Sequence, residues 1–302
     1  MRMAAVGPAI PAPRSWAGPL LVGLVILAWA SAFPGVRAVS GTLTPESIAC
    51  TRSWVAALAL ALAAVVIRPP LPAWRDLPAL SAVGVLGVFA YNLAFNLGIR
   101  TVPAGTTAFV VNGSIVLGMA LVGAWWFRER VPMVRWAALA LAVTGLTGIS
   151  LDGDGRQGGA GIPWLLAAAA SWVVGALIQK GLTQRLGAMG LACWSFWIGC
   201  LPLVFWLPGS IRDLSAAPAA TQWGVIYLGV VPSAAATLVW AMILDRMPAS
   251  QAAVGVAGIP VAAVAIAWLW LGELPAVASI IGGALILAGV MLNLWPARSA
   301  PG

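Results

Sequence analysis

The sequence contains no histidine, and only 8% of its 302 residues are charged. Without histidine there is no imidazole to serve as a general base, a proton shuttle or a metal ligand. A soluble globular chain carries roughly 25% charged residues, so this chain has too few polar groups to cover a soluble fold. With 62% hydrophobic residues and a mean hydropathy of +0.99, the composition predicts a polytopic membrane protein.

Cysteine is scarce as well, with three residues, each inside an apolar run: Cys50, Cys193 and Cys200. Cys193 and Cys200 lie two helical turns apart, which is too far for a disulfide within one helix. We therefore expect the cysteines to be small packing residues.

The charge that is present is mostly positive, giving a net charge of +8 and a pI near 11.0. A nucleic-acid-binding protein gathers its basic residues on one face. Here the sixteen Lys and Arg residues occur singly at the ends of apolar runs. We interpret them as topology signals and expect no nucleic-acid partner.

Apolar runs of about 20 residues are long enough to cross a bilayer as helices, and we expect ten of them. They are residues 16–38, 45–67, 77–99, 104–127, 133–151, 162–180, 189–207, 222–244, 247–274 and 276–295. The Gly-rich segment 152–161 is polar and separates two halves. The predicted organisation is a tail at 1–15, a first five-helix repeat at 16–151, the linker 152–161, a second repeat at 162–295 and a tail at 296–302.

The first apolar run has a second interpretation. A basic start, an apolar stretch and Ala30-Ser31-Ala32 resemble a cleavable signal peptide. The apolar run continues past Ala32, however, and the segment is echoed at 162–180. We therefore favour an integral helix.

The two halves match at a nearly constant offset. Residues recur 143 to 145 positions later as Trp29 and Trp172, Arg37 and Lys180, Gly84 and Gly229, Pro103 and Pro248, Glu129 and Glu273, and Gly145 and Gly289. Since five helices is an odd number, the second copy enters the membrane upside down. The predicted fold is all-α, with ten transmembrane helices in a 5+5 inverted-topology repeat.

The distribution of basic residues sets the expected orientation. With a cytoplasmic N-terminus, the inner segments hold eleven Lys and Arg residues, and the outer segments hold four, namely Arg37, Arg100, Arg156 and Arg212. The remaining one, Arg52, lies within a span. This positive-inside bias places both termini in the cytoplasm.

Pro260 lies near the middle of the ninth predicted span. A proline at this depth removes one backbone donor and frees one carbonyl, which is tolerated only against protein or a wet cavity. Pro103-Ala104, an apolar span and Glu129 repeat the same design in the first half. Two helices with a loosened middle suggest a transporter built from repeats, and we expect Pro260 to be a hinge.

Uncharged polar and aromatic side chains inside the spans are the candidate substrate contacts. They are Tyr91, Asn92, Phe95, Asn96, Asn112, Trp172, Gln179, Thr237, Trp240 and Gln251. For any one of them, a hydrogen bond between helices is an equally good explanation. For the set, we favour a water-accessible, aromatic-lined, uncharged cavity.

Ionisable groups inside spans are few. Arg52 either snorkels and caps helix ends or contacts the substrate, and the sequence favours neither. Glu129 and Glu273 lie at span ends, where a structural role is favoured over catalysis. No carboxylate lies deep within a span, which argues against a proton antiporter for cationic drugs.

Several of these residues resemble the drug/metabolite transporter superfamily, and within it the EamA-type ten-helix carriers and YddG-like amino-acid exporters. They are Trp29-x-Ser31-x-Phe33 with Arg37, Arg52, Pro103-Ala104 leading to Glu129, and Met247-Pro248-Ala249-Ser250 through Pro260 to Glu273. The resemblance implies a bacterial inner membrane, export of small metabolites and a central cavity. The chain departs from it at Ile115, where the family often has a proline, so Asn112-Gly113 is expected to supply the looseness, with Gly113 as the second hinge.

The sequence thus predicts a secondary transporter that exports small neutral or zwitterionic metabolites, preferably aromatic amino acids, by alternating access. Its partners are the small-molecule substrate and the lipid bilayer, with no cofactor and no metal, and a monomer is expected although the oligomeric state is left open. A multidrug or nucleobase exporter of the same superfamily is the alternative substrate class. A passive channel is a further alternative, whereas an intramembrane enzyme lacks a visible nucleophile with its base or metal.

Overall fold

The computed structural model describes residues 17–126, 133–152, 159–244 and 257–294, and within these ranges all regular structure is helical. The α-helices are α1 (Ala17–Val39), α2 (Pro45–Ile67), α3 (Leu77–Gly84), α4 (Tyr91–Ile99), α5 (Ala104–Trp126), α6 (Met133–Asp152), α7 (Ile162–Cys200), α8 (Leu207–Ala216), α9 (Ala219–Leu228), α10 (Ala236–Leu244), α12 (Ile259–Leu271) and α13 (Val277–Leu294). Shorter 3-10 or π turns are η1 (Trp74–Asp76), η2 (Val85–Ala90), η3 (Gly159–Gly161), η4 (Leu201–Trp206) and η5 (Gly229–Ala235).

Six helical stretches are long and apolar enough to cross a membrane, which confirms the prediction of a multi-pass membrane protein. They are Leu20–Val39, Pro45–Ile67, Trp74–Ile99, Ile162–Gln179, Gly181–Ala216 and Ala219–Ile243. Four shorter apolar helices accompany them within the described ranges, at Ala104–Met119, Trp136–Gly145, Ile259–Leu271 and Val277–Leu292. The count of ten spans therefore stays a prediction.

Local sequence signals set where the helices begin and end. Thr44 caps α2 by accepting the backbone N–H of Ser47 at 3.2 Å, and Pro45 follows in the first turn, where no helical donor is needed. Gly187 has φ 67° and ψ 164°, so α7 is two helices meeting at a kink. The helix expected over 189–207 continues through η4 and α8 to Ala216, because no residue with positive φ interrupts it.

Two spans contain a π-helical segment at corresponding positions of the two halves. The segment η2 joins α3 to α4, and η5 joins α9 to α10. Gly84 precedes η2 and Gly229 begins η5, and both sit against the backbone of another helix. A Cβ at Gly84 would lie 2.7 Å from the Ser195 carbonyl oxygen, and one at Gly229 would lie 2.8 Å from that of Arg52. Each glycine thus permits a close helix crossing.

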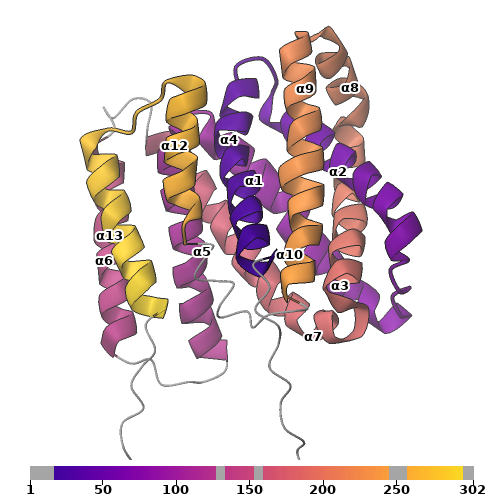
Figure 1. The fold of residues 1–302 in the computed structure, drawn as a ribbon, viewed down its shortest axis with the longest axis horizontal. Helices are drawn as coiled ribbons and strands as arrows, with labels where there is room; N and C mark the ends of the chain where they lie inside the picture. The colour runs from indigo at the N-terminus through magenta and orange to yellow at the C-terminus, as the bar shows by residue number, and fades with distance from the viewer. Residues whose placement is uncertain (1–16, 127–132, 153–158, 245–256, 295–302) are drawn as a thin grey trace, which may run out of the picture.

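Corresponding helices of the two halves make corresponding contacts: each helix packs against the other half in the way its counterpart does. Helix α1 packs on α12 as α7 packs on α5, and α2 packs on η5 as α3 and η2 pack on α7. Helices α6 and α13, from opposite halves, lie side by side at the left of Figure 1. A Cβ at Gly145 would meet the Gly282 oxygen at 2.3 Å, and one at Gly289 the Ala138 oxygen at 2.6 Å. Small residues thus bring these two helices together.

The first described turn of α1 and the last turn of α13 lie at the same end of the bundle, the lower end in Figure 1. At the opposite end, the Arg37 Nε donates to Glu273 Oε1 at 2.9 Å, and Ser47 Oγ donates to Asp213 Oδ2 at 2.6 Å. Near the lower end Arg185 forms an ion pair with Asp76. Both ends are therefore tied by polar contacts across elements distant in the sequence.

Candidate functional site

The centre of the bundle contains a group of aromatic rings from α1 and α4. Tyr91 and Phe95 stack with ring centroids 5.8 Å apart, and Phe33 meets Phe95 edge-on at 5.4 Å. Their spacing of four residues places Tyr91 and Phe95 on one face of α4, which turns toward α1. The structure therefore brings together two residues that the sequence predicted as substrate contacts.

A second aromatic pair continues this surface. Trp29 and Trp240 lie 5.2 Å apart, with Trp240 on α10 one turn after the half-buried Thr237. Trp29 packs against both the apolar cluster that holds Phe95 and the one that surrounds Trp240. The two aromatic groups are thus joined through α1.

Asn92 and Asn96 are buried amides on the next face of α4. The Asn92 Nδ2 donates to the Val88 carbonyl at 2.7 Å, whereas its Oδ1 has no partner in the described part of the chain. Asn96 has an exposed fraction of 0%, and neither its Oδ1 nor its Nδ2 has a partner among the described residues. Burying such a group without a partner costs about 1–3 kcal/mol, so these amides are poised for water or a ligand.

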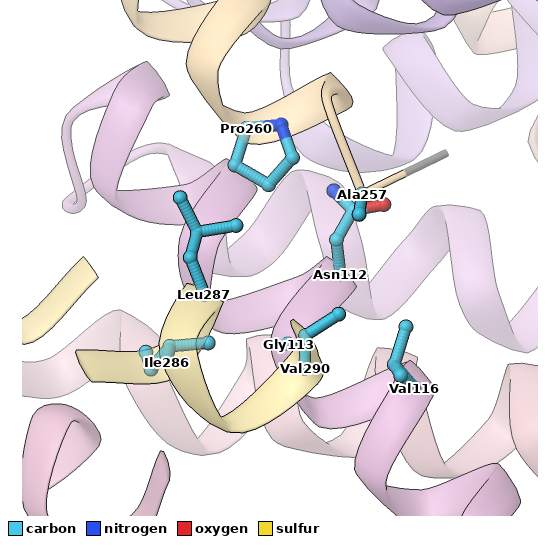
Figure 2. A pocket seen from close by; sticks show the side chains of 8 residues that line it. All are labelled: Asn112, Gly113, Val116, Ala257, Pro260, Ile286, Leu287 and Val290. Atoms are coloured by element: carbon cyan, nitrogen blue, oxygen red, sulfur yellow. The ribbon is translucent and has the colours of Figure 1, made fainter. Parts of the chain in front are cut away.

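The remaining predicted contact of the first half and both predicted hinges meet at a small pocket (Figure 2). Asn112 reaches from α5 toward the turn before α12, and its Nδ2 donates to the Ala108 carbonyl at 3.0 Å. Gly113 faces α13, where a Cβ would lie 2.1 Å from Ile286 Cγ2. Apolar side chains complete the lining, and the pocket has room for about one water molecule.

Pro260 lies in the first turn of α12, which begins at Ile259 after the N-cap residue Gly258. In this position the missing N–H leaves no helical hydrogen bond unmade. The sequence predicted a span over residues 247–274 with Pro260 near its middle, but the first part of that span, up to residue 256, lies outside the described residues. In the described part, the helix begins at Ile259, so Pro260 lies in its first turn.

The other predicted contacts are more dispersed. Trp172 is exposed on α7, and Gln179 is half-buried further along the same helix, where its carbonyl accepts from Thr183 Oγ1 at 3.1 Å. Gln251 and Glu129 lie outside the described residues. The structure thus groups the α4, α1 and α10 residues and leaves Trp172 apart from them.

Two polar contacts in the interior involve residues that the predicted site leaves out. Arg52 Nη2 donates to Ser233 Oγ at 3.1 Å, and Ser31 Oγ and Tyr227 Oη lie 2.6 Å apart. Ser31 stands between Trp29 and Phe33 in the sequence, which is a signal that could have been used. No sequence pattern indicates Tyr227, because its contact with Ser31 depends on which helix packs against α9.

Glu273 belongs to a polar network that joins helix ends at one end of the bundle. Its Oε1 accepts from Arg37, and its Oε2 accepts the Ala104 backbone N–H at 3.2 Å, which is at the positive start of α5. Arg37 also donates to the carbonyls of Ile99 and Arg100 at the end of α4. One ion pair therefore holds the ends of α1, α4, α5 and α12 together.

The sequence matches the model of a known protein family. The sequence matches the family model described as the EamA-like transporter family over residues 16–151 and again over 159–295. Two successive matches to one model show that the chain holds two copies of the repeat.

Three relatives from bacteria illustrate the similarity. The uncharacterized transporter YdfC of Bacillus subtilis is 30% identical over 90% of this chain and 87% of its own length. A probable terminal-alkyne amino-acid exporter of Streptantibioticus cattleyicolor is 32% identical over 89% of this chain and 90% of its own length. A probable amino-acid metabolite efflux pump of Salmonella typhimurium is 29% identical over 91% and 94%.

A solved crystal structure has the same fold. It superposes with a TM-score of 0.59 at 17% sequence identity and covers 91% of this chain and 96% of that chain. At this identity, the similarity concerns the fold alone.

Proposed function

The chain belongs to the EamA-like transporter family of the drug/metabolite transporter superfamily, and from this premise we propose that it exports small neutral or zwitterionic metabolites, preferably amino acids, by alternating access. Membership itself makes the chain a membrane transporter rather than an enzyme, because its relatives are named as transporters and exporters. One of these relatives is named a probable terminal-alkyne amino-acid exporter, and another is named a probable amino-acid metabolite efflux pump. The substrate class and the mechanism are the proposal.

The observation that carries the substrate proposal is the pair of buried amides beside stacked rings. Asn92 and Asn96 hold polar atoms without partners among the described residues, and Tyr91 and Phe95 present ring faces on the adjacent side of α4. An amino acid offers complementary groups, since its ammonium and carboxylate take hydrogen bonds and its side chain stacks on aromatic rings. Trp240, Thr237, Asn112, Trp172, Gln179 and Gln251 are proposed to contribute to the same path.

The proposal of alternating access is supported by the corresponding contacts that equivalent helices of the two halves make, and by the ion pair of Arg37 with Glu273. A 5+5 inverted repeat of ten spans gives the two halves such equivalent contacts. Closure of one end by a network that joins four helices is what an inward-open or occluded carrier requires. Gly113 and Pro260 line one small pocket together with Asn112. Movement of the backbone at these two residues is proposed to open the closed end of the bundle.

The proposed location is a bacterial inner membrane with both termini in the cytoplasm. It is supported by the common end at which α1 begins and α13 ends. Arg37, Arg100 and Arg212 belong to the opposite end, which is proposed to be outside.

The test is uptake into liposomes that contain the purified protein. A panel of radiolabelled amino acids, purines and hydrophobic cations is offered with and without a pH gradient. We expect amino acids to be transported best, aromatic and branched ones among them. Transport of purines or hydrophobic cations with no transport of any amino acid would overturn the substrate proposal.

A further inference from the structure

We infer that Arg52 binds the carboxylate of the transported molecule, so that the central site selects substrates carrying a carboxylate, an inference that rests on the proposed function and deepens it. The predicted site was uncharged and left Arg52 out.

Arg52 is buried in the bundle. Its exposed fraction is 8%, although Leu58 and Leu62 further along α2 are more than 60% exposed. The guanidinium reaches η5 and donates from Nη2 to Ser233 Oγ. A snorkelling arginine would extend along the lipid face to the membrane surface, so the structure excludes that interpretation of Arg52.

The charge of Arg52 is not balanced by any carboxylate in the described part of the chain. The two ion pairs found there involve Arg37 with Glu273 and Arg185 with Asp76. An isolated charge inside a membrane protein is costly, and such groups are partnered or functional. Arg52 has only the neutral hydroxyl of Ser233 as a partner among these residues.

Most of the donors on Arg52 have no partner among the described residues. A guanidinium carries five N–H groups, of which one is accounted for by Ser233, and the buried Nε has no partner in the described chain. Two parallel N–H groups of a guanidinium fit the two oxygens of a carboxylate. The unused donors of Arg52 therefore match this anion in charge and in shape.

The surroundings hold Arg52 in place at the site. Ser233 donates its own proton to the Leu228 carbonyl at 2.8 Å, which turns the hydroxyl oxygen toward the guanidinium. Gly229 packs against the Arg52 backbone, which fixes α2 on η5. Helix α2, which carries Arg52, also packs against α4, which carries the stacked rings of Tyr91 and Phe95.

The anchor is present in one half only. At the offset of 144 that relates the two copies, the residue corresponding to Arg52 is Phe196. A single charged anchor in a protein of two similar halves gives the substrate one orientation. The carboxylate is held near α2 and η5, and the side chain lies toward the rings of α1 and α4.

The experiment compares an amino acid with its amide. Purified protein in liposomes takes up radiolabelled L-phenylalanine or L-phenylalaninamide, in which a neutral amide replaces the carboxylate, and the apparent KM and rate are measured for each. The variants are R52Q, R52K and, as the matched control, R212Q, which makes the same change at an exposed arginine of α8. Thermal unfolding of each variant in detergent reports whether it is folded.

We expect the wild-type protein to prefer phenylalanine over the amide by at least about tenfold, as a charge-assisted hydrogen bond predicts. R52Q should reduce this preference to about twofold or less. R52K, which keeps the charge but not the paired donors, should show an intermediate preference. R212Q should keep the preference of the wild-type protein.

Wild-type preference in R52Q and R52K would overturn the inference, as would loss of preference in R212Q equal to that in R52Q. Should R52Q not fold, the intermediate preference of R52K decides the matter. Absence of transport of both probes and of every other amino acid by the wild-type protein would overturn the proposed function itself. Transport of phenylalanine and its amide equally well by the wild-type protein would overturn only the role of Arg52.

Discussion

At the scale of single residues, Asn96 gives the sharpest contrast between a packing role and a transport role. Its side chain is fully buried, and both of its amide atoms are without partners among the described residues. A residue that holds helices together would have a hydrogen bond to lose. Asn96 has none in the described structure, so its value to the protein is expected in another state, with the cavity open.

The substitution N96L tests this interpretation. Replacing an unpartnered amide by an apolar group of similar size is nearly neutral or stabilising, so the unfolding temperature should stay the same or rise. Transport should fall about three- to tenfold in apparent affinity if one substrate hydrogen bond is lost. The measurement is thermal unfolding together with liposome uptake.

The matched control is N92L, which removes the hydrogen bond from Asn92 to the Val88 carbonyl and should lower both stability and transport. A stable N96L protein that transports at the wild-type rate would show that Asn96 is no part of the substrate path.

Individual residues also show what the sequence could and could not predict. Tyr91, Phe95 and Trp240 were predicted as aromatic cavity residues, and the structure places them around α1 in joined groups. The role of Arg52 could not be decided, because the apolar residues of α2 are spread around the whole helix and their periodicity does not indicate which face meets η5. That orientation follows from the close crossing at Gly229, which only the three-dimensional structure shows.

At the scale of elements, the two close crossings beside the π-helical segments are the main constraint on how the spans pack. Gly84 lies against α7, and Gly229 lies against α2. Their spacing of 145 was visible in the sequence as part of the duplication. The π-helical segments were not predicted, because one extra residue in a helical turn leaves no trace in the apolar run of η2, and Pro232 inside η5 does not by itself specify a π turn.

We expect G84A and G229A each to destabilise the protein by about 1–3 kcal/mol, since overpacking against a backbone has this cost. The control is G87A in the same span as Gly84, where a Cβ would meet nothing within 4 Å. In a helix that change is neutral or slightly stabilising. Thermal unfolding in detergent measures all three variants.

Equal unfolding temperatures for G84A, G229A and G87A would contradict the close crossings. A loss confined to G84A would mean that the two halves pack differently at corresponding positions.

At the scale of the whole molecule, the two halves form one bundle in which corresponding helices make corresponding contacts. The sequence predicted this from the recurrence of residues such as Glu129 and Glu273, and the double family match supports two copies. It could not predict the polar network that joins the helix ends, because that depends on contacts between helices far apart in the chain. Glu273, for example, reaches both Arg37 and the start of α5.

The proposed alternating access exposes one site to each side of the membrane in turn, which a pore does not do. Liposomes loaded with a high concentration of unlabelled L-phenylalanine and placed in a trace of the labelled amino acid test this directly. A carrier accumulates label transiently above its equilibrium level, because unlabelled molecules leaving the liposome return the site to the outside. We predict such counterflow, and label that only approaches equilibrium without overshoot, at the same rate in loaded and empty liposomes, would contradict alternating access.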